Sequence, residues 1–232
     1  RILLLYDVHV PFYDNKAYRA AVEWGVEHKV NTVVFGGDFV DFYEHSDFQK
    51  DPRVVDLWGS VADAYEVMAW TRDRLPNAKF YYMIGNHEYR LERGFMRKYP
   101  EMFVLTDYTL DDVTKFSDFD VTYLKHRQLL KIGDMFGGHG DEFGRGGITV
   151  NPARTFSLKA KTSFFGGHSH RTSEHTARGI DTIIDCYSIG CLCELNPAYW
   201  PYNEWNHGFA YIHVEDGEVK FFNAKIENGK VK

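Results

Sequence analysis

Histidine and acidic side chains recur in this sequence wherever an apolar run ends in a short loop. The run from Lys79 to Ile84 passes into Gly85-Asn86-His87-Glu88, which brings an amide oxygen, an imidazole and a carboxylate together. Four other runs end in Asp7-Val8-His9, Gly37-Asp38, Gly138-His139 and Gly167-His168-Ser169-His170. Imidazole combined with carboxylate suits manganese, iron, zinc or nickel better than calcium, which prefers oxygen ligands.

Side chains in these loops form a set of candidate metal ligands. The candidates are Asp7, His9, Asp38, Asn86, His139, His168 and His170. One ion takes only about four to six ligands, so a set of this size predicts two ions that share a bridging carboxylate. Two ions roughly 3.5–4 Å apart clamp a phosphoryl group for in-line displacement. The pattern therefore predicts chemistry on a phosphate ester.

The elements that position these loops alternate between strand and helix in the first half of the chain. Apolar runs predict strands at residues 2–6, 32–35 and 79–84. Caps and helical spacing predict helices over residues 15–28, 51–75 and 89–98, the last ending before Pro100. This order implies parallel strands joined by right-handed crossovers. The carboxyl ends of such strands meet at one edge of the sheet, where open α/β sheets build their sites.

The second half of the chain is rich in short strands. They are predicted at residues 121–124, 128–132, 135–136, 163–165, 173–178, 182–189, 209–214 and 218–225. Asp216-Gly217 predicts a hairpin turn between the last two, and Asn151-Pro152 begins a helix that runs to about Lys161. We therefore expect an α/β fold of two packed mixed β-sheets flanked by helices, in a single domain over residues 1–232.

The five motifs, in this order between residues 7 and 170, resemble those of the calcineurin-like metallophosphoesterase superfamily. The resemblance implies a four-layer αββα sandwich and a phosphoester hydrolase in which a metal-bridging hydroxide attacks phosphorus. It implies two divalent ions, with manganese expected first and iron, zinc or nickel as alternatives. One ion would be held by Asp7, His9 and His170, the other by Asn86, His139 and His168, with Asp38 bridging both.

The resemblance also assigns proton transfer. His87 would be the acid on the leaving oxygen, and Asp41, three residues after Asp38, would orient its ring. In the serine/threonine phosphatase branch an arginine that holds the substrate phosphate follows this aspartate. Phe42 stands in that place here, which argues against protein-phosphatase activity. Glu88 is interpreted as capping the following helix rather than as a ligand.

Candidate substrate contacts come from arginines and aromatic residues. Arg90 and Arg145 are candidate phosphate contacts, with solvated surface positions as the alternative. Trp200 and Trp205 lie in an irregular, proline-marked segment that could stack a base or plug the core. The favoured substrate is a phosphodiester in a nucleotide or short nucleic acid. The alternatives are a phosphomonoesterase, either a generalist or a protein phosphatase, and a non-catalytic scaffold of the same fold.

Composition excludes several other functions. A formal net charge of -6 gives no basic field for long duplexes or anionic membranes. The sequence has no apolar run near the roughly 18 residues of a membrane span and no recognisable secretory leader, so we expect a cytoplasmic protein without membrane partners. Three cysteines, an odd number, indicate a reducing compartment, and Cys191 and Cys193 are interpreted as buried thiols rather than zinc ligands.

Overall fold

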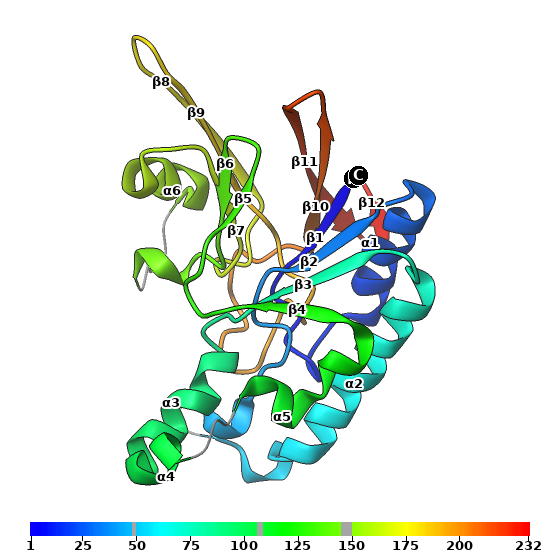
Figure 1. Cartoon of the computed structure of the whole chain (residues 1–232), viewed down its shortest axis with the longest axis vertical. Coiled ribbons are helices and arrows are strands. Elements are labelled where there is room, and N and C mark those ends of the chain that lie inside the picture. Colours follow the sequence, from blue (N-terminus) through cyan, green and yellow to red (C-terminus); the bar gives the residue numbers. More distant parts are fainter. Residues whose placement is uncertain (48–49, 106–108, 145–149) are drawn as a thin grey trace.

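Two β-sheets packed face to face form the centre of the molecule (Figure 1). The computed structural model describes residues 1–47, 50–105, 109–144 and 150–232. The larger sheet has the strand order β12-β11-β10-β1-β2-β3-β4. Its strands are β1 (Ile2–Leu5), β2 (Thr32–Phe35), β3 (Lys79–Met83), β4 (Val121–Leu124), β10 (Gly208–Glu215), β11 (Glu218–Glu227) and β12 (Lys230–Val231). Strands β1 to β3 are parallel, as predicted, and β4 also pairs parallel with β3, so the loops after all four leave from one edge.

The smaller sheet has the order β5-β6-β7-β9-β8. Its strands are β5 (Leu130–Ile132), β6 (Met135–Gly137), β7 (Phe164–Gly166), β8 (Ser173–Arg178) and β9 (Ile183–Ser188). Strands β6, β7 and β9 are parallel, whereas β5 and β8 pair antiparallel with their neighbours. Both sheets are therefore mixed, which confirms that expectation. The β8–β9 hairpin extends well beyond the body of the protein (Figure 1).

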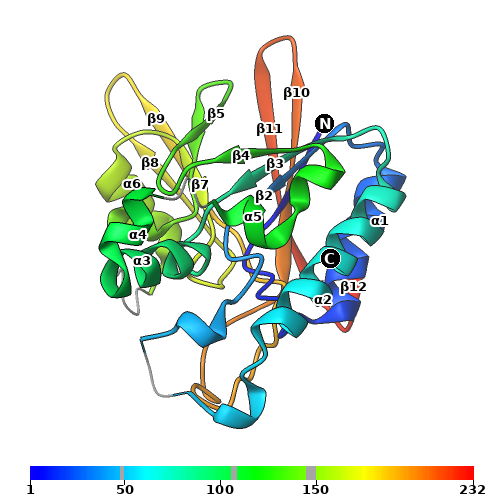
Figure 2. The same ribbon diagram turned by 60° about the horizontal axis from the view of Figure 1, so that its bottom comes forward.

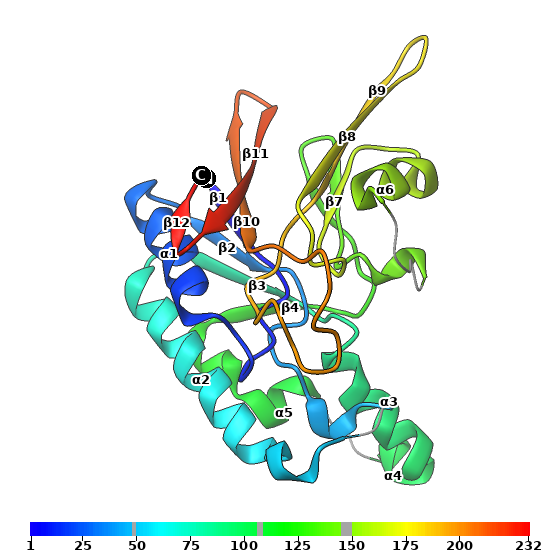
Figure 3. The same cartoon turned by 180° about the vertical axis from the view of Figure 1, so that it is seen from behind.

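Helices cover the outer faces of the two sheets. Those on the side of the larger sheet are α1 (Asn15–Glu27), α2 (Leu57–Arg74) and α5 (Leu110–Thr114), and α6 (Pro152–Ala160) packs on the smaller sheet. Figure 3, seen from behind, shows α1 and α2 on one side and α6 on the other. This arrangement confirms the four-layer αββα sandwich. Two further helices, α3 (Glu88–Lys98) and α4 (Pro100–Leu105), lie on the opposite side of the molecule from α1 and α2 (Figure 2).

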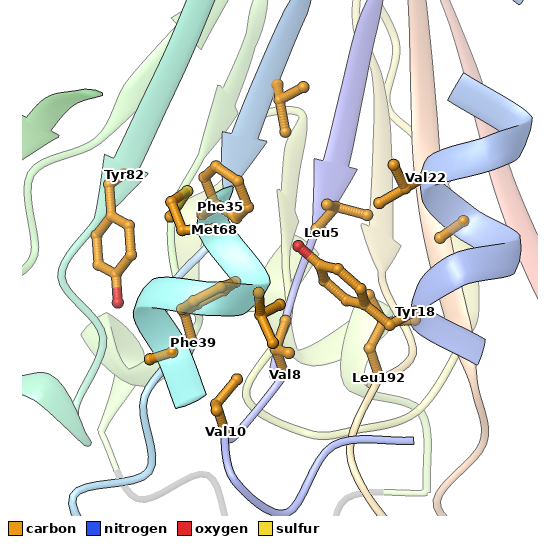
Figure 4. Packing of buried hydrophobic residues seen from close by; sticks show 14 of the residues in the cluster. Leu5, Val8, Val10, Tyr18, Val22, Phe35, Phe39, Met68, Tyr82 and Leu192 are labelled. Carbon is orange, nitrogen blue, oxygen red and sulfur yellow. The ribbon is translucent and has the colours of Figure 1, made fainter. Parts of the chain in front are cut away.

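Three apolar clusters fill the spaces between these layers. The first joins α1 and α2 to the larger sheet, with Leu5, Tyr18 and Met68 buried together (Figure 4). The second lies between the sheets, and the third packs α6 on the smaller sheet. In the second cluster the fully buried Tyr6 donates a hydrogen bond from its hydroxyl to the Gly138 carbonyl at 3.0 Å. The strand exits of the two sheets are thereby tied together.

Two helix boundaries differ from the sequence-based expectation. Asp51-Pro52 begins only a 3-10 turn over Pro52–Val54, and α2 starts later, where Asp56 accepts a hydrogen bond from the Gly59 amide at 3.0 Å. The chain therefore holds two successive capping residues, of which the second begins the long helix. Pro100 ends α3 as expected but also opens α4, because proline fits the first position of a helix. Among the described helices, none combines the length and the apolarity that crossing a membrane requires.

Candidate metal centre

The exits of five strands, three from the larger sheet and two from the smaller, meet between the two sheets. Asp7 and His9 follow β1, Asp38 follows β2, Asn86 and His87 follow β3, His139 follows β6, and His168 and His170 follow β7. All the parallel strands concerned point toward this place, so residues more than 160 positions apart become neighbours. The structure thus brings together every candidate ligand that the sequence singled out.

The facing atoms of these side chains are close. His9 Nε2 lies 3.1 Å from His170 Nε2, and His139 Nε2 lies 3.2 Å from Asp38 Oδ2 and 3.1 Å from Asn86 Oδ1. Ligand atoms of Asp38, His139 and His168 all lie within 4.8 Å of one another. Asp38 also forms such a group with His9 and His87, so its carboxylate faces both halves of the cluster. This position is compatible with a bridging role.

The chemistry of the donor set fits cations. Asp7 is fully buried, and its Oδ1 finds no hydrogen-bond partner within the described parts of the chain, although His170 Nε2 lies 3.5 Å away. A buried carboxylate oxygen without a hydrogen-bond partner lowers the stability of the fold unless a cation faces it. Burial disfavours the charged form of His170, but the Asp7 carboxylate outweighs burial and raises the pKa of that ring to about 10. The Asp7 carboxylate therefore favours positive charge at this place, which a divalent ion would supply.

The loops that carry these residues have tight backbones. Positive φ angles occur at Asp7 (50°), His9 (55°), Asp38 (52°), His168 (64°) and His170 (56°). Such conformations are uncommon outside glycine and cluster at functional sites. Glycine allows the loops to approach, because a Cβ at Gly85 would lie 2.3 Å from Asp38 Oδ1 and one at Gly167 would lie 2.4 Å from Asp7 Oδ2. A larger residue at Gly85 or Gly167 would therefore clash with the neighbouring loop.

His87 and Asp41 form a hydrogen-bonded pair at the edge of the cluster. His87 Nδ1 donates to the Asp41 carbonyl at 2.9 Å and lies 3.1 Å from Asp41 Oδ2. The same carboxylate oxygen lies 2.9 Å from His9 Nδ1, so Asp41 contacts both the candidate acid and a candidate ligand. Although burial raises the pKa of Asp41, the two histidines outweigh it and keep that pKa below its usual range. Asp41 is therefore an anion that fixes the orientation of two imidazoles.

Arg90 lies beside this pair. One of its terminal nitrogens donates to His87 Nε2 at 2.8 Å, and the other lies 3.3 Å from the Asp41 carbonyl oxygen. Arg90 projects from α3, whereas Phe42 in the loop after Asp41 is fully buried. Arg145, the other arginine singled out by sequence, lies outside the described residues.

Glu88 makes more contacts than its expected role as a helix cap requires. Its buried carboxylate accepts hydrogen bonds from the backbone amides of residues 38–40, from the Gly85 amide and from the Tyr82 hydroxyl, at 2.7 to 3.1 Å. None of these donors lies within α3, which begins at Glu88 itself. The bond from the Gly85 amide agrees with the capping interpretation, because Glu88 lies in the first turn of α3, but the other donors belong to other segments. Glu88 also joins the loop that carries Asp38 to the loop that carries Asn86 and His87.

A second glutamate, which sequence analysis did not single out, holds another loop in the same way. Glu142 accepts from the His139 amide at 2.9 Å and from the Gly140 amide at 2.7 Å. In both loops a glutamate accepts from the amide three residues before it, which is the spacing of a capping box. This spacing in the sequence could have identified both glutamates as acceptors for a backbone amide in their own loop.

The aromatic segment between Pro197 and Trp205 borders the cluster. The Trp205 ring lies 4.2 Å from the ring of His170, measured between centroids, and the Trp200 ring lies 5.8 Å from Trp205. Trp200 is 41% exposed, so it is not a core plug. The structure therefore places aromatic surface directly beside a candidate ligand.

A family model described as calcineurin-like phosphoesterase matches residues 1–172. The chain belongs to the calcineurin-like phosphoesterase family. It is accordingly a metallophosphoesterase, a hydrolase that acts on phosphoester bonds, and members of this family generally bind two divalent ions. The resemblance inferred from the five motifs is thus confirmed.

Three proteins similar to this phosphoesterase have low sequence identity to it. The Gene 54 protein of Mycobacterium phage D29 is 25% identical over 248 residues, which cover 99% of this chain and 95% of that protein. Vps29 of Entamoeba histolytica, solved as a complex with Zn²⁺, is 13% identical with a TM-score of 0.51 and covers 100% of this chain and 95% of its own. Vps29 of Cryptosporidium parvum is 12% identical with a TM-score of 0.50, covering 100% and 93%. At these identities the structural likeness shows the fold alone.

Proposed function

We propose that this calcineurin-like phosphoesterase is a phosphodiesterase that cleaves nucleotides or short single-stranded nucleic acid. The observation that carries the proposal is the aromatic segment beside the candidate metal ligands, with Trp205 packed on His170 and Trp200 partly exposed next to it. Base stacking on such rings contributes about 1–3 kcal/mol per base. A monoester without a base would make no use of this surface.

Two divalent ions would be held by the residues that converge between the sheets. Asp7, His9 and His170 would hold one, Asn86, His139 and His168 the other, and Asp38 would contact both. When bound, the ions would acidify water and neutralise charge on the phosphate oxygens. Manganese remains our first expectation, with iron, zinc or nickel as alternatives.

The remaining steps fall to side chains. Water loses a proton to solvent as its oxygen attacks phosphorus, the bond from phosphorus to the leaving oxygen breaks, and that oxygen takes the bonding electron pair. His87 would give this oxygen a proton from Nε2, the atom that faces Asp38 Oδ2 at 3.7 Å, once Nε2 is protonated and Arg90, which donates to that nitrogen in the structure, contacts the phosphate instead. Asp41 accepts at Nδ1 of His87 and holds the ring in that orientation. General acid catalysis of this kind contributes about 10²–10⁴-fold to the rate.

Substrate preference follows from the groups around His87. Phe42 is buried where the serine/threonine phosphatase branch has its phosphate-binding arginine, so the strongest contact for a terminal dianion is missing from that loop. Arg90 supplies a guanidinium from α3 instead, which suits the single negative charge of a diester. The net charge of -6 provides no basic track for long duplexes, which favours a small or single-stranded substrate.

The test compares kcat/KM for bis-nitrophenyl phosphate, nitrophenyl phosphate, a cyclic nucleotide and a short single strand. We expect a preference for diesters. Trp200→Ala should lower kcat/KM for the single strand about 5- to 140-fold, the equivalent of one lost stack, and leave bis-nitrophenyl phosphate unchanged. Phe222→Ala is the matched control, because Phe222 is an exposed aromatic residue (54%) near Trp24 on the α1 side of the larger sheet.

A preference for the monoester, combined with no effect of Trp200→Ala on any nucleotide substrate, would refute the diesterase assignment. In that case the enzyme is a phosphomonoesterase and the metal centre is unaffected by the result. We further propose a reducing compartment such as the cytoplasm, which is supported by the three buried cysteines being free thiols.

A further inference from the structure

The segment Cys191-Leu192-Cys193 lies against the loop that carries Asp7 and His9. The Leu192 amide donates to the Asp7 carbonyl at 3.0 Å, and the Asp14 amide donates to the Leu192 carbonyl at 2.8 Å. The Leu192 side chain packs with Val8 and Tyr18 in the first apolar cluster (Figure 4). The backbone of this segment is therefore fixed relative to Asp7, and its two thiols occupy defined positions.

One of these thiols contacts a candidate ligand. Cys193 Sγ lies 3.6 Å from Nδ1 of His170, whose Nε2 faces His9 Nε2 at 3.1 Å and Asp7 Oδ1 at 3.5 Å. Cys193 is only 4% exposed and His170 only 7%, so this contact is sheltered from water. Cys191 Sγ donates to the Asn206 carbonyl at 3.6 Å, and the Cys191 side chain also interacts with His170. The ring of His170 thus has one nitrogen toward the cluster and the other toward the Cys193 sulfur.

A histidine that binds metal through Nε2 must carry its hydrogen on Nδ1, and that hydrogen is usually given to a carboxylate, a carbonyl or water. Here the group that faces Nδ1 is a sulfur atom. We infer that Cys193 is a positioning residue, which accepts the Nδ1 hydrogen of His170 and holds its Nε2 toward the ion shared with Asp7 and His9. This inference rests on the proposed two-ion site and adds to it a residue outside the seven proposed ligands. The Cys193 sulfur also lies within 4.8 Å of ligand atoms of His9 and His170, so direct binding is the alternative to be tested.

Three variants test this role. Cys193→Ala removes the acceptor, whereas Cys193→Ser keeps a smaller one. Cys186→Ala is the matched control, because Cys186 is equally buried (1%) but lies on β9 and donates to the Thr162 carbonyl at 3.6 Å. The dissociation constants for Mn²⁺ are measured by competition with a chromophoric chelator, and the unfolding midpoints are measured without metal.

We expect Cys193→Ala to weaken binding of one of two Mn²⁺ ions about 10- to 100-fold, the usual effect of losing an outer hydrogen-bond partner. Cys193→Ser should restore most of that affinity, and Cys186→Ala should leave both ions unchanged even if it lowers the unfolding midpoint. Wild-type affinity in Cys193→Ala, or an equal loss in the alanine and serine variants, overturns the inference.

The alternative that Cys193 itself binds the ion is tested with Co²⁺. A thiolate ligand gives a near-ultraviolet charge-transfer band, and we expect none in the Co²⁺-loaded wild type. A band that disappears in Cys193→Ala overturns the positioning role. If the wild type fails to bind two ions, the proposed two-ion site is refuted before any variant is compared. If the wild type binds two ions and the Cys193 variants bind them equally well, the two-ion site stands and only the role of Cys193 is refuted.

Discussion

Replacement of Gly85 by alanine is the sharpest test of how the loops are packed. The added Cβ would lie 2.3 Å from Asp38 Oδ1 and 2.5 Å from the Asp38 amide nitrogen. Ordinary contact begins near 3.4 Å, so the shortfall is 3.4 − 2.3 = 1.1 Å. Asp38 cannot retreat freely, because Glu88 accepts a hydrogen bond from its amide at 3.0 Å. One of the two loops must therefore move.

The cost of that movement follows from two contributions. Overpacking costs about 1–3 kcal/mol, and loss of a hydrogen bond to the Glu88 carboxylate costs about 1.5–3 kcal/mol. We expect Gly85→Ala to lower the free energy of unfolding by about 3–5 kcal/mol, which corresponds to a drop in Tm of roughly 6–20 °C for a chain of this size. Because Asp38 faces both candidate ion sites, affinity for both ions should fall.

Gly94→Ala is the matched control for this prediction. Gly94 lies within α3, and a Cβ there would meet only His45 Nδ1 at 3.4 Å. Alanine should raise helix stability by about 0.5–1 kcal/mol at such a position. Both variants are to be unfolded by heat with and without Mn²⁺. A Gly85→Ala protein with the stability and metal affinity of the wild type would show that the loops are not packed as described.

Two further predictions concern the chemistry. Chelation should abolish activity and Mn²⁺ should restore it, while Asp38→Asn should weaken both ions in a metal titration; full turnover after exhaustive chelation would contradict the two-ion model. His87→Ala should slow hydrolysis about 10²–10⁴-fold for esters with poor leaving groups, but much less for nitrophenyl esters, with both ions still bound. Asp41→Asn should give a milder form of the same pattern, and an equal loss on good and poor leaving groups would argue against His87 as the acid.

The convergence of the candidate ligands was predictable because it follows from local signals. Each apolar run identifies a strand, and each glycine, aspartate or histidine after it identifies an exit loop. Parallel strands then place their exits at one edge, so no long-range contact had to be guessed. The sheet arrangement in the structure agrees with this reasoning for Asp7, Asp38 and Asn86 in the larger sheet.

The contacts that hold these residues in position could not be predicted in the same way. Glu88 reaches the loop around Asp38 across 50 positions, and Cys193 reaches His170 across 23, and no periodic pattern encodes either pairing. Local signals also compete with one another. Asp51 and Asp56 are both good capping residues, and only packing of α2 on its neighbours decides which of them begins the long helix.

The ligand set is divided between the two sheets, since Asp7 and Asp38 come from the larger one and His139 and His170 from the smaller. Ions bound between them would act as cross-links through the middle of the sandwich. The free energy that holds the sheets together would then grow with the logarithm of the free ion concentration once the sites begin to fill. The enzyme would be mechanically firmest in the metal-replete state in which it is also catalytically competent, so depletion would remove rigidity and activity together.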